Sequence, residues 1–367
     1  MVLPTNNSGH AMKLAYDIRK TYLENYQSGP DLPKPTASSL VREQKDFFGT
    51  KIDSRLGIAA GLLLNSKWLL AYADLGYDLL TYKTVRSAYR PCYPPPNWVF
   101  IESDADHPET RVTALEQLPT DPLQTSSSVC FGMPSMDPDT WRQDIVQIRN
   151  RLPSGKALIV SVVGTPNSET APERQIETLA KDFAQCAEWA VDAGAQVVEA
   201  NFSCPNVCTK EGSIYMDPNL SRTIAEQIKA RIPKVPLLIK AGNFPDSSTL
   251  GDFLKATDDF VDGIALLNGM SREVRHRDGR PVYGVDKLTA GILGRMVHKT
   301  AIAKVRQAVQ TIEEFDLSLK ILAVGGVSCP NDIQDFLDAG ADAIMLGSAP
   351  MYIPHLAEEA KQALPDL

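Results

Sequence analysis

Basic residues are scarce in this sequence relative to acidic ones. Lysine and arginine together number 37 against 45 aspartates and glutamates, which gives a formal net charge of −8 and a pI near 5.3. No basic face is evident, so neither a nucleic acid nor an anionic membrane surface is expected as a partner. The N-terminus also lacks an apolar run of signal-peptide or membrane-spanning length. We therefore expect an intracellular, cytoplasmic protein without a membrane span.

Cysteine and histidine are also few, with six and five residues in a chain of 367. Six cysteines in a chain of this length do not make a disulfide framework. Cys204 and Cys208 lie close together, but no second pair or nearby histidine completes a zinc pattern, so no metal site is predicted. Neither iron–sulfur cysteine spacing nor a dinucleotide-binding glycine fingerprint is present, so the sequence predicts neither an iron–sulfur cluster nor a dinucleotide site of that type.

What the sequence does contain is a repeated architecture. Short, apolar, β-rich runs recur at residues 56–60, 78–83, 157–164, 196–202, 236–241, 263–268, 320–325 and 343–347. Helical patterns follow most of them, at residues 67–75, 176–193, 220–231, 247–256, 300–312 and 331–339. Continuous apolar strands that alternate with helices predict an α/β fold of the (β/α)8 TIM-barrel type. A doubly wound open sheet is the alternative, but no Gly-x-Gly-x-x-Gly follows the first strand.

Two segments interrupt this alternation. Residues 86–150 follow the second strand and residues 269–299 follow the sixth, and both are too long for ordinary connections. Long excursions after strands usually cover an active site, so we expect cover loops at both places. Residues 11–26 carry a charged helical pattern and precede a proline-rich link. We therefore divide the chain into an N-terminal helical extension with its linker, residues 1–46, and a barrel domain, residues 47–367.

Polar side chains or glycines stand at one end of every predicted strand, where barrels of this type place their chemistry. In chain order they are Asn65, Lys83, Thr84, Ser161, Asn201, Cys204, Lys240, Asn268, Gly325, Gly326, Gly347 and Ser348. The fourth strand is the most informative, because Cys204 follows it between Asn201 and Asn206. A thiol beside two carboxamides can take a proton while the amides hold a polar ring. This combination indicates an enzyme.

The glycines after the last two strands indicate a phosphate site. Gly325-Gly326 and Gly347-Ser348 follow strands seven and eight, where barrels often bind phosphate through backbone N–H groups. Turn geometry alone would also explain a Gly-Gly pair, but the two pairs together favour phosphate.

Two lysines end apolar strands and need a counter-charge. Lys83 ends the second strand and Lys240 the fifth, and a buried unpaired charge is costly. Snorkelling to the rim would explain a single lysine. Two lysines at the same mouth as a phosphate site suit an electron-rich ligand, since a cation stabilises the anionic reduced form of a flavin.

The segment Asn201-Phe-Ser-Cys-Pro-Asn206 resembles the Asn-x-Ser-Cys-Pro-Asn signature of the dihydroorotate dehydrogenase family. Six further motifs occur in the family's order: Gly57-Ile-Ala-Ala-Gly61, Leu80-Thr-Tyr-Lys-Thr84, Leu238-Ile-Lys240, Asp262-Gly-Ile-x-x-x-Asn268, Val324-Gly-Gly326 and Leu346-Gly-Ser348. The similarity covers about residues 47–352. The family's fold is an FMN-binding (β/α)8 barrel, in agreement with the strand count.

The resemblance implies FMN-dependent oxidation of dihydroorotate to orotate in pyrimidine biosynthesis. Cys204 stands where the soluble class carries its catalytic base, which removes the C5 proton while the C6 hydride passes to the flavin. A free thiol has a pKa of ~8.5, so it must be lowered or lose its proton as a loop closes. The implied substrate-binding residues are Lys83, Asn201, Asn206 and Asn268. The implied cofactor-binding residues are Ala60, Gly61, Lys83, Thr84, Ser161, Asn201, Lys240, Gly291, Gly294, Gly325, Gly326, Gly347 and Ser348.

The chain departs from the family's pattern at three places. Val129 stands where members usually carry another substrate asparagine, shortly before Phe131-Gly-Met-Pro134. Leu62-Leu-Leu-Asn65 lacks the lysine that the membrane-associated class uses there, and Gly269 stands where threonine or serine is common. Losing one buried hydrogen-bonding group can change discrimination between substrates by orders of magnitude.

Several alternatives therefore stay open. The substrate could be another dihydropyrimidine of the uracil or thymine type. A non-redox Schiff-base lyase could use Lys83 or Lys240, and a phosphate-binding protein without turnover would need no Cys204. The electron acceptor is equally open between fumarate, a quinone and a partner flavoprotein. We expect a homodimer, to which the N-terminal extension could contribute.

Overall fold

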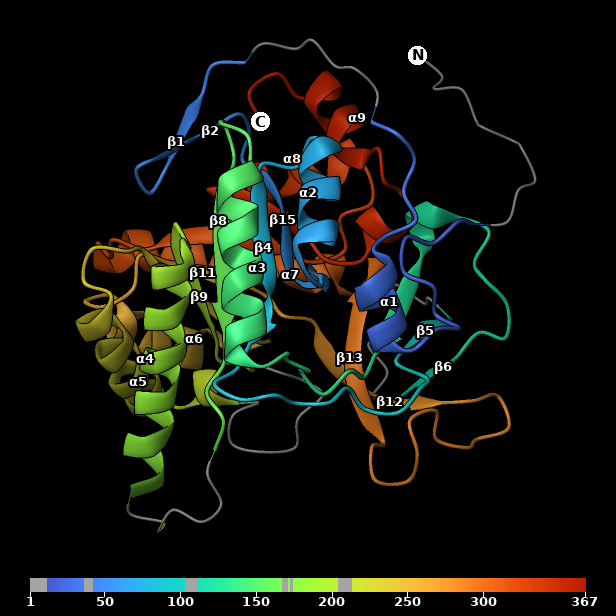
Figure 1. The fold of residues 1–367 in the computed structure, drawn as a ribbon, viewed down its shortest axis with the longest axis horizontal. Helices are drawn as coiled ribbons and strands as arrows, with labels where there is room; N and C mark the ends of the chain where they lie inside the picture. The colour runs from blue at the N-terminus through green and yellow to red at the C-terminus, as the bar shows by residue number, and fades with distance from the viewer. Residues whose placement is uncertain (1–11, 36–41, 103–110, 167–170, 172–173, 204–212) are drawn as a thin grey trace.

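The computed structural model describes residues 12–35, 42–102, 111–166, 171, 174–203 and 213–367 (Figure 1). Eight parallel strands in it close into a barrel, with β9 and β10 completing the ring. They are β3 (Leu56–Leu63), β4 (Leu79–Val85), β8 (Ala157–Val162), β9 (Val197–Asn201), β10 (Leu237–Ala241), β11 (Gly263–Leu266), β14 (Lys320–Val324) and β15 (Ala343–Leu346). Each strand coincides with one of the eight predicted apolar runs, so the predicted (β/α)8 barrel is confirmed.

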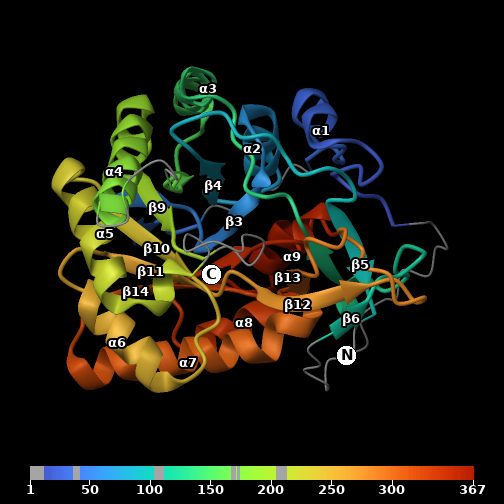
Figure 2. The same cartoon turned by 90° about the horizontal axis from the view of Figure 1, so that it is seen from below.

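Helices surround this barrel, as Figure 2 shows for α4 to α8. The helices that follow barrel strands are α2 (Ser66–Asp74), α3 (Pro138–Arg151), α4 (Gln175–Ala193), α5 (Pro218–Arg231), α6 (Ser247–Thr257), α7 (His298–Phe315), α8 (Pro330–Asp338) and α9 (Leu356–Ala363). Six were predicted to within a few residues. The treatment of residues 86–150 as one excursion was wrong at its C-terminal end, because α3 begins there. Asp137 caps that helix and Pro138 occupies its first position, a start signal that the sequence analysis overlooked.

The two excursions build one additional sheet beside the barrel (Figures 1 and 2). Its strands are β5 (Trp98–Ile101), β6 (Arg111–Thr113), β7 (Ser126–Val129), β12 (Met270–Arg275) and β13 (Thr289–Gly294), in the order β5-β7-β13-β12-β6. The pairing of β7 with β13 joins the excursion after β4 to the excursion after β11. The two cover segments therefore act together as one structural unit.

A hairpin covers the end of the barrel at which the parallel strands begin. It consists of β1 (Lys45–Phe47) and β2 (Thr50–Ile52), joined by Phe48 and Gly49, both with positive φ. Two consecutive positive φ values match the type I′ turn that two-residue hairpins favour. Phe47 and Ile52 pack in one cluster with inward-facing barrel residues. The interior is thus sealed by apolar packing at this end, and the cavity lies at the other.

The N-terminal segment is less helical than its charge pattern predicts. Helix α1 runs only from Tyr22 to Ser28, and residues 12–21 form turns and irregular chain. A capping box between Thr21 and Glu24 fixes the start of α1, which explains why the helix does not begin earlier. Tyr16 and Tyr22 are buried, so aromatic side chains anchor this segment on the rest of the molecule. Among the residues described above, no helix is both long and apolar enough to cross a membrane.

Candidate active site

One cavity opens at the carboxyl ends of the barrel strands. Its volume is about 1150 Å³ when the open mouth is counted. Most of the predicted site residues line it: Ala60, Gly61, Lys83, Thr84, Asn201, Lys240, Asn268, Gly291, Gly294, Gly325, Gly326, Gly347 and Ser348. The structure therefore brings together residues from all but one of the barrel strands, with two glycines from β13 of the additional sheet.

Two predicted positions, Ser161 and Asn65, do not line the cavity, and two more fall outside the described residues. Ser161 is fully buried and does not line the cavity; its hydroxyl lies 3.1 Å from that of Thr84 and so supports the wall from behind. Cys204 and Asn206, the predicted base and one predicted substrate amide, lie outside the described residues. Asn65, singled out as a strand-end polar residue, is the N-cap of α2 and also donates to the carbonyl of Tyr26. Its role is to hold the helix rather than to face the cavity.

The two lysines are buried with their ammonium groups held by backbone carbonyls. The Nζ atom of Lys240 donates to the Ala60 carbonyl at 3.1 Å, and that of Lys83 donates to the Gly61 carbonyl at 3.2 Å. Lys240 and Lys83 are only 2% and 7% exposed, which excludes snorkelling to solvent. Both charges are thus fixed beside adjacent residues of β3, where an electron-rich ligand would meet them.

Aromatic rings flank one of these lysines. The Nζ atom of Lys83 lies 5.0 Å from the ring centroids of Tyr22 and Phe131. Cation–π contacts of this geometry are favourable, most of all when desolvated. The two rings come from α1 and from the excursion after β4, so residues far apart in the sequence fix the position of Lys83.

The two carboxamides in the cavity are oriented by the backbone of Ser203. The Asn201 side-chain oxygen accepts from the Ser203 N–H at 3.1 Å, and the Asn268 amide donates to the Ser203 carbonyl. The Asn201 amide nitrogen lies 3.5 Å from the Thr84 hydroxyl. Each side chain keeps hydrogen-bonding capacity for a ligand, because a carboxamide offers two N–H groups and an oxygen with two lone pairs. These contacts also position the chain at the residue that precedes Cys204.

Glu199 is a buried acid two residues before Asn201, and the sequence analysis overlooked it. It occupies the middle of β9 and is 3% exposed. Burial raises the pKa of Glu199, whereas the charge of Lys240 and a hydrogen bond from Ser161 lower it. The signal was present, because an acidic residue inside an apolar strand must have a compensating partner.

Four lining glycines present bare backbone to the cavity and are called the glycine corner: Gly294, Gly325, Gly326 and Gly347. A methyl group on Gly294 would meet the Thr125 carbonyl at 2.4 Å, and one on Gly326 would meet the Gly294 carbonyl at 2.7 Å. Only glycine lets these loops approach so closely. Gly61 and Gly347 differ, because nothing lies within 4 Å of an added methyl group there. Ser348 is buried beside Gly347, at the start of the short 3-10 helix η6 (Ala349–Met351).

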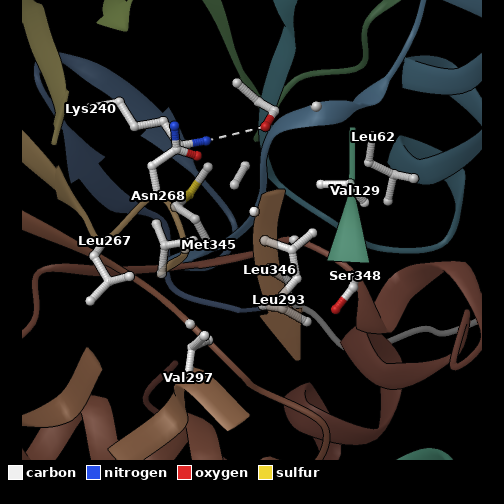
Figure 3. A pocket seen from close by; sticks show the side chains of 18 of the residues that line it. Leu62, Val129, Lys240, Leu267, Asn268, Leu293, Val297, Met345, Leu346 and Ser348 are labelled. Carbon is white, nitrogen blue, oxygen red and sulfur yellow. Dashed lines mark hydrogen bonds between the residues drawn. The ribbon is translucent and has the colours of Figure 1, made fainter. Parts of the chain in front are cut away.

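The cavity lining combines polar and apolar side chains. Figure 3 shows Lys240 and Asn268 together in one part of the cavity, and Leu62 and Val129 together in another. Trp98, Phe131 and Met133 add further apolar surface, which the sequence analysis had not assigned to the site. Val129 lies between Trp98 and Gly291 in the register of the additional sheet. An apolar lining with fixed cations and amides suits a partly polar small-molecule ligand.

Comparisons with known proteins agree with this geometry. The family model described as dihydroorotate dehydrogenase matches residues 129–367. The chain belongs to the dihydroorotate dehydrogenase family. By that membership it is an oxidoreductase, which disfavours the lyase and the non-catalytic alternatives.

Individual relatives support the same assignment over different lengths. A dihydroorotate dehydrogenase of Dictyostelium discoideum is 33% identical over 363 residues, covering 94% of this chain and 96% of that protein. A catalytic subunit of dihydroorotate dehydrogenase B (NAD(+)) from Staphylococcus carnosus is 27% identical, covering 51% of this chain and 59% of that protein. The crystal structure of an Eimeria tenella dihydroorotate dehydrogenase in complex with ferulenol shares the fold, with a TM-score of 0.66, 16% identity, and coverage of 88% and 83% of the two chains.

Proposed function

We propose that this protein is an FMN-dependent enzyme that oxidises dihydroorotate to orotate, with Cys204 as the base. The observation that supports this most is the convergence of two buried lysines, two fixed carboxamides and a glycine corner on one cavity. The cavity opens at the carboxyl ends of the strands, where barrel enzymes place their active sites.

The residues present fit FMN. Gly61 and Gly347 leave open space where a side chain would protrude, and Gly325, Gly326 and Ser348 present backbone and a hydroxyl to the same region. Such a corner would hold a ribityl phosphate through backbone N–H groups. When bound, FMN supplies the hydride acceptor. Lys240, fixed by the Ala60 carbonyl, would stabilise negative charge on the cofactor.

The other residues would hold the substrate and move its proton. Asn201 and Asn268 would meet the alternating N–H and C=O edge of a pyrimidine, because a carboxamide both donates and accepts. Their hydrogen bonds to Ser203 would fix the start of the segment that carries Cys204. The Cys204 thiolate would then take the C5 proton as the C6 hydride leaves.

A second candidate substrate is a dihydropyrimidine of the uracil or thymine type. Val129 offers the cavity no polar atom. Gly269 offers no side chain either, and its φ of +82°, with the Ile292 carbonyl 2.8 Å from an added methyl group, leaves no room for one. Two hydrogen-bonding positions common in the family are thus missing, which favours a substrate with fewer polar groups.

The deciding experiment is an absorbance spectrum of the purified protein, followed by anaerobic addition of dihydroorotate. A yellow protein that bleaches on mixing would support both cofactor and substrate. A yellow protein that bleaches with dihydrouracil instead would move the substrate to the second candidate. A colourless protein that takes up no added FMN would refute the proposal.

The role of Cys204 has its own test. Cys204→Ala should slow flavin bleaching at neutral pH by at least ~100-fold, the lower range for loss of a general base. Cys186→Ala is the matched control, because Cys186 is fully buried in α4, away from the cavity. Equal rates in both variants would exclude Cys204 as the base. The cytoplasmic location and the homodimer stay predictions from the sequence.

A further inference from the structure

Three metal-ligating side chains meet behind the glycine corner, outside the cavity lining. His298 begins α7, and Asp332 and Asp335 lie three residues apart on α8. The His298 Nε2 atom lies 3.4 Å from Asp332 Oδ1 and 3.5 Å from Asp335 Oδ2. The three atoms all lie within 4.8 Å of one another. No short sequence motif connects them, which is why the sequence predicts no metal site here.

The hydrogen bond on the other ring nitrogen decides what Nε2 can do. His298 Nδ1 lies 3.0 Å from the Gly325 carbonyl oxygen. Because a carbonyl only accepts, Nδ1 carries a hydrogen and donates it. In a neutral imidazole Nε2 then presents its lone pair. His298 is 3% exposed and, within the part of the chain that the structure describes, Nε2 has no hydrogen-bond partner, so this lone pair would face two carboxylates.

Two of the three distances between these atoms match those between ligands around one metal ion. Zinc binds histidine nitrogen and carboxylate oxygen at ~2.0–2.2 Å. Ligand atoms at neighbouring corners of a tetrahedron of that size are about 3.4 Å apart, close to the two distances of 3.4 and 3.5 Å. A backbone carbonyl that accepts the second N–H is also the usual support of a metal-binding histidine.

Hydrogen-bond donors at the cluster are concentrated on Asp332. Arg295 pairs with Asp332 at 2.7 Å, and the other Asp332 oxygen accepts from the backbone N–H groups of Ser328 and Cys329. Asp332 Oδ1 retains a second lone pair for a metal. The Asp335 side chain is 54% exposed, which gives an ion a path from solvent and leaves a fourth position for water.

We propose that His298, Asp332 and Asp335 bind a divalent transition-metal ion of the zinc type, which ties α7 to α8 behind the glycine corner. The ligand set is one nitrogen and two carboxylate oxygens with an open fourth position. The rival arrangement is a protonated His298 that donates to both carboxylates and binds no metal.

Zinc titration of the full-length protein, stripped with a chelator and then freed of it, tests this directly. Calorimetry should give one Zn²⁺ per chain, and saturation should raise Tm. Asp335→Asn and His298→Gln should each weaken binding at least ~10-fold, the lower limit seen even for outer-shell changes. Asp338→Asn, an exposed change on the same helix, should leave binding unchanged.

Cys329 directly precedes α8, and its thiol is the nearby group that could bind zinc in place of the proposed ligands. Cys329→Ser should retain the Zn²⁺ stoichiometry and affinity. Absence of saturable binding would overturn the proposal in favour of the protonated histidine. Binding that survives both Asp335→Asn and His298→Gln, or that Cys329→Ser abolishes, would also overturn it, since the metal would then sit elsewhere.

Discussion

A side chain added at Gly326 should weaken folding, whereas one added at Gly347 should weaken FMN binding. Gly326 has φ +68°, and an added methyl group would meet Gly294 O and His298 Cβ, each at 2.7 Å. The left-handed conformation costs ~1–2 kcal/mol and overpacking ~1–3 kcal/mol. Gly326→Ala should therefore lower the free energy of unfolding by about 2–5 kcal/mol, out of a total of ~5–15 kcal/mol.

Gly347 should respond in binding rather than in folding. Nothing lies within 4 Å of an added methyl group, and its φ is not left-handed. Gly347→Ala should change the free energy of unfolding of the apoprotein by less than ~0.5 kcal/mol. If FMN occupies that space, an overlap costing ~1–3 kcal/mol would weaken FMN binding by ~5- to ~140-fold.

The assay combines denaturant unfolding of the apoprotein with FMN titration of each variant. Gly251→Ala in α6 is the control, because its added methyl group makes an ordinary 3.6 Å contact with Thr311 away from the cavity. The reasoning about the corner is refuted if Gly347→Ala binds FMN as tightly as the unmodified protein. It is also refuted if Gly326→Ala unfolds at the same denaturant concentration as the unmodified protein.

Three further substitutions test other parts of the structure. Asn65→Ala removes the N-cap of α2 and should cost ~0.5–2 kcal/mol in denaturant unfolding, with FMN content unchanged. Asp78→Asn leaves Lys156 and Lys361 without the buried carboxylate that both contact, at 2.8 and 2.6 Å, and should cost ~3–5 kcal/mol in the same assay. Glu199→Gln tests the pH dependence of stability. Burial raises the folded-state pKa of Glu199 above 4.5, so protonated Glu199 contributes stability in acid. This contribution is lost as the pH rises through the folded-state pKa. Over that interval Tm should fall less with pH in the variant than in the unmodified protein.

The barrel was predictable because its strands are buried on both faces. Such strands are nearly continuous apolar runs, and all eight were found from this signal alone. The additional sheet was not predictable in the same way. Its strand β7 is Ser126-Ser-Ser-Val129, without the apolar alternation of a half-buried strand, and its partner β13 lies far away in the sequence. Only tertiary pairing makes these residues a sheet.

The site was predictable where it depends on strand ends. Parallel barrel strands present their carboxyl ends at one face, so a polar residue at each end predicts convergence without knowledge of side-chain direction. Ser161 shows the limit, because it precedes the strand end and points into the packed wall beside Thr84. Asn65 shows another, since the same asparagine can serve a site or cap a helix. The apolar lining at Val129 and Leu293 could not be located, because the two excursions had no predicted partner.

The contacts of Lys83 connect the N-terminal segment and the first excursion to the barrel. Its ammonium lies 5.0 Å from Tyr22 in the N-terminal segment and from Phe131 in the first excursion. The proposed boundary at residue 46 stays a prediction, but this contact crosses it and reaches a residue that lines the cavity. Two desolvated cation–π contacts stabilise the ammonium by about 1 kcal/mol or more. Because Lys83 also donates to Gly61 on β3, the N-terminal segment takes part in fixing a charge beside the proposed cofactor position rather than only extending the barrel.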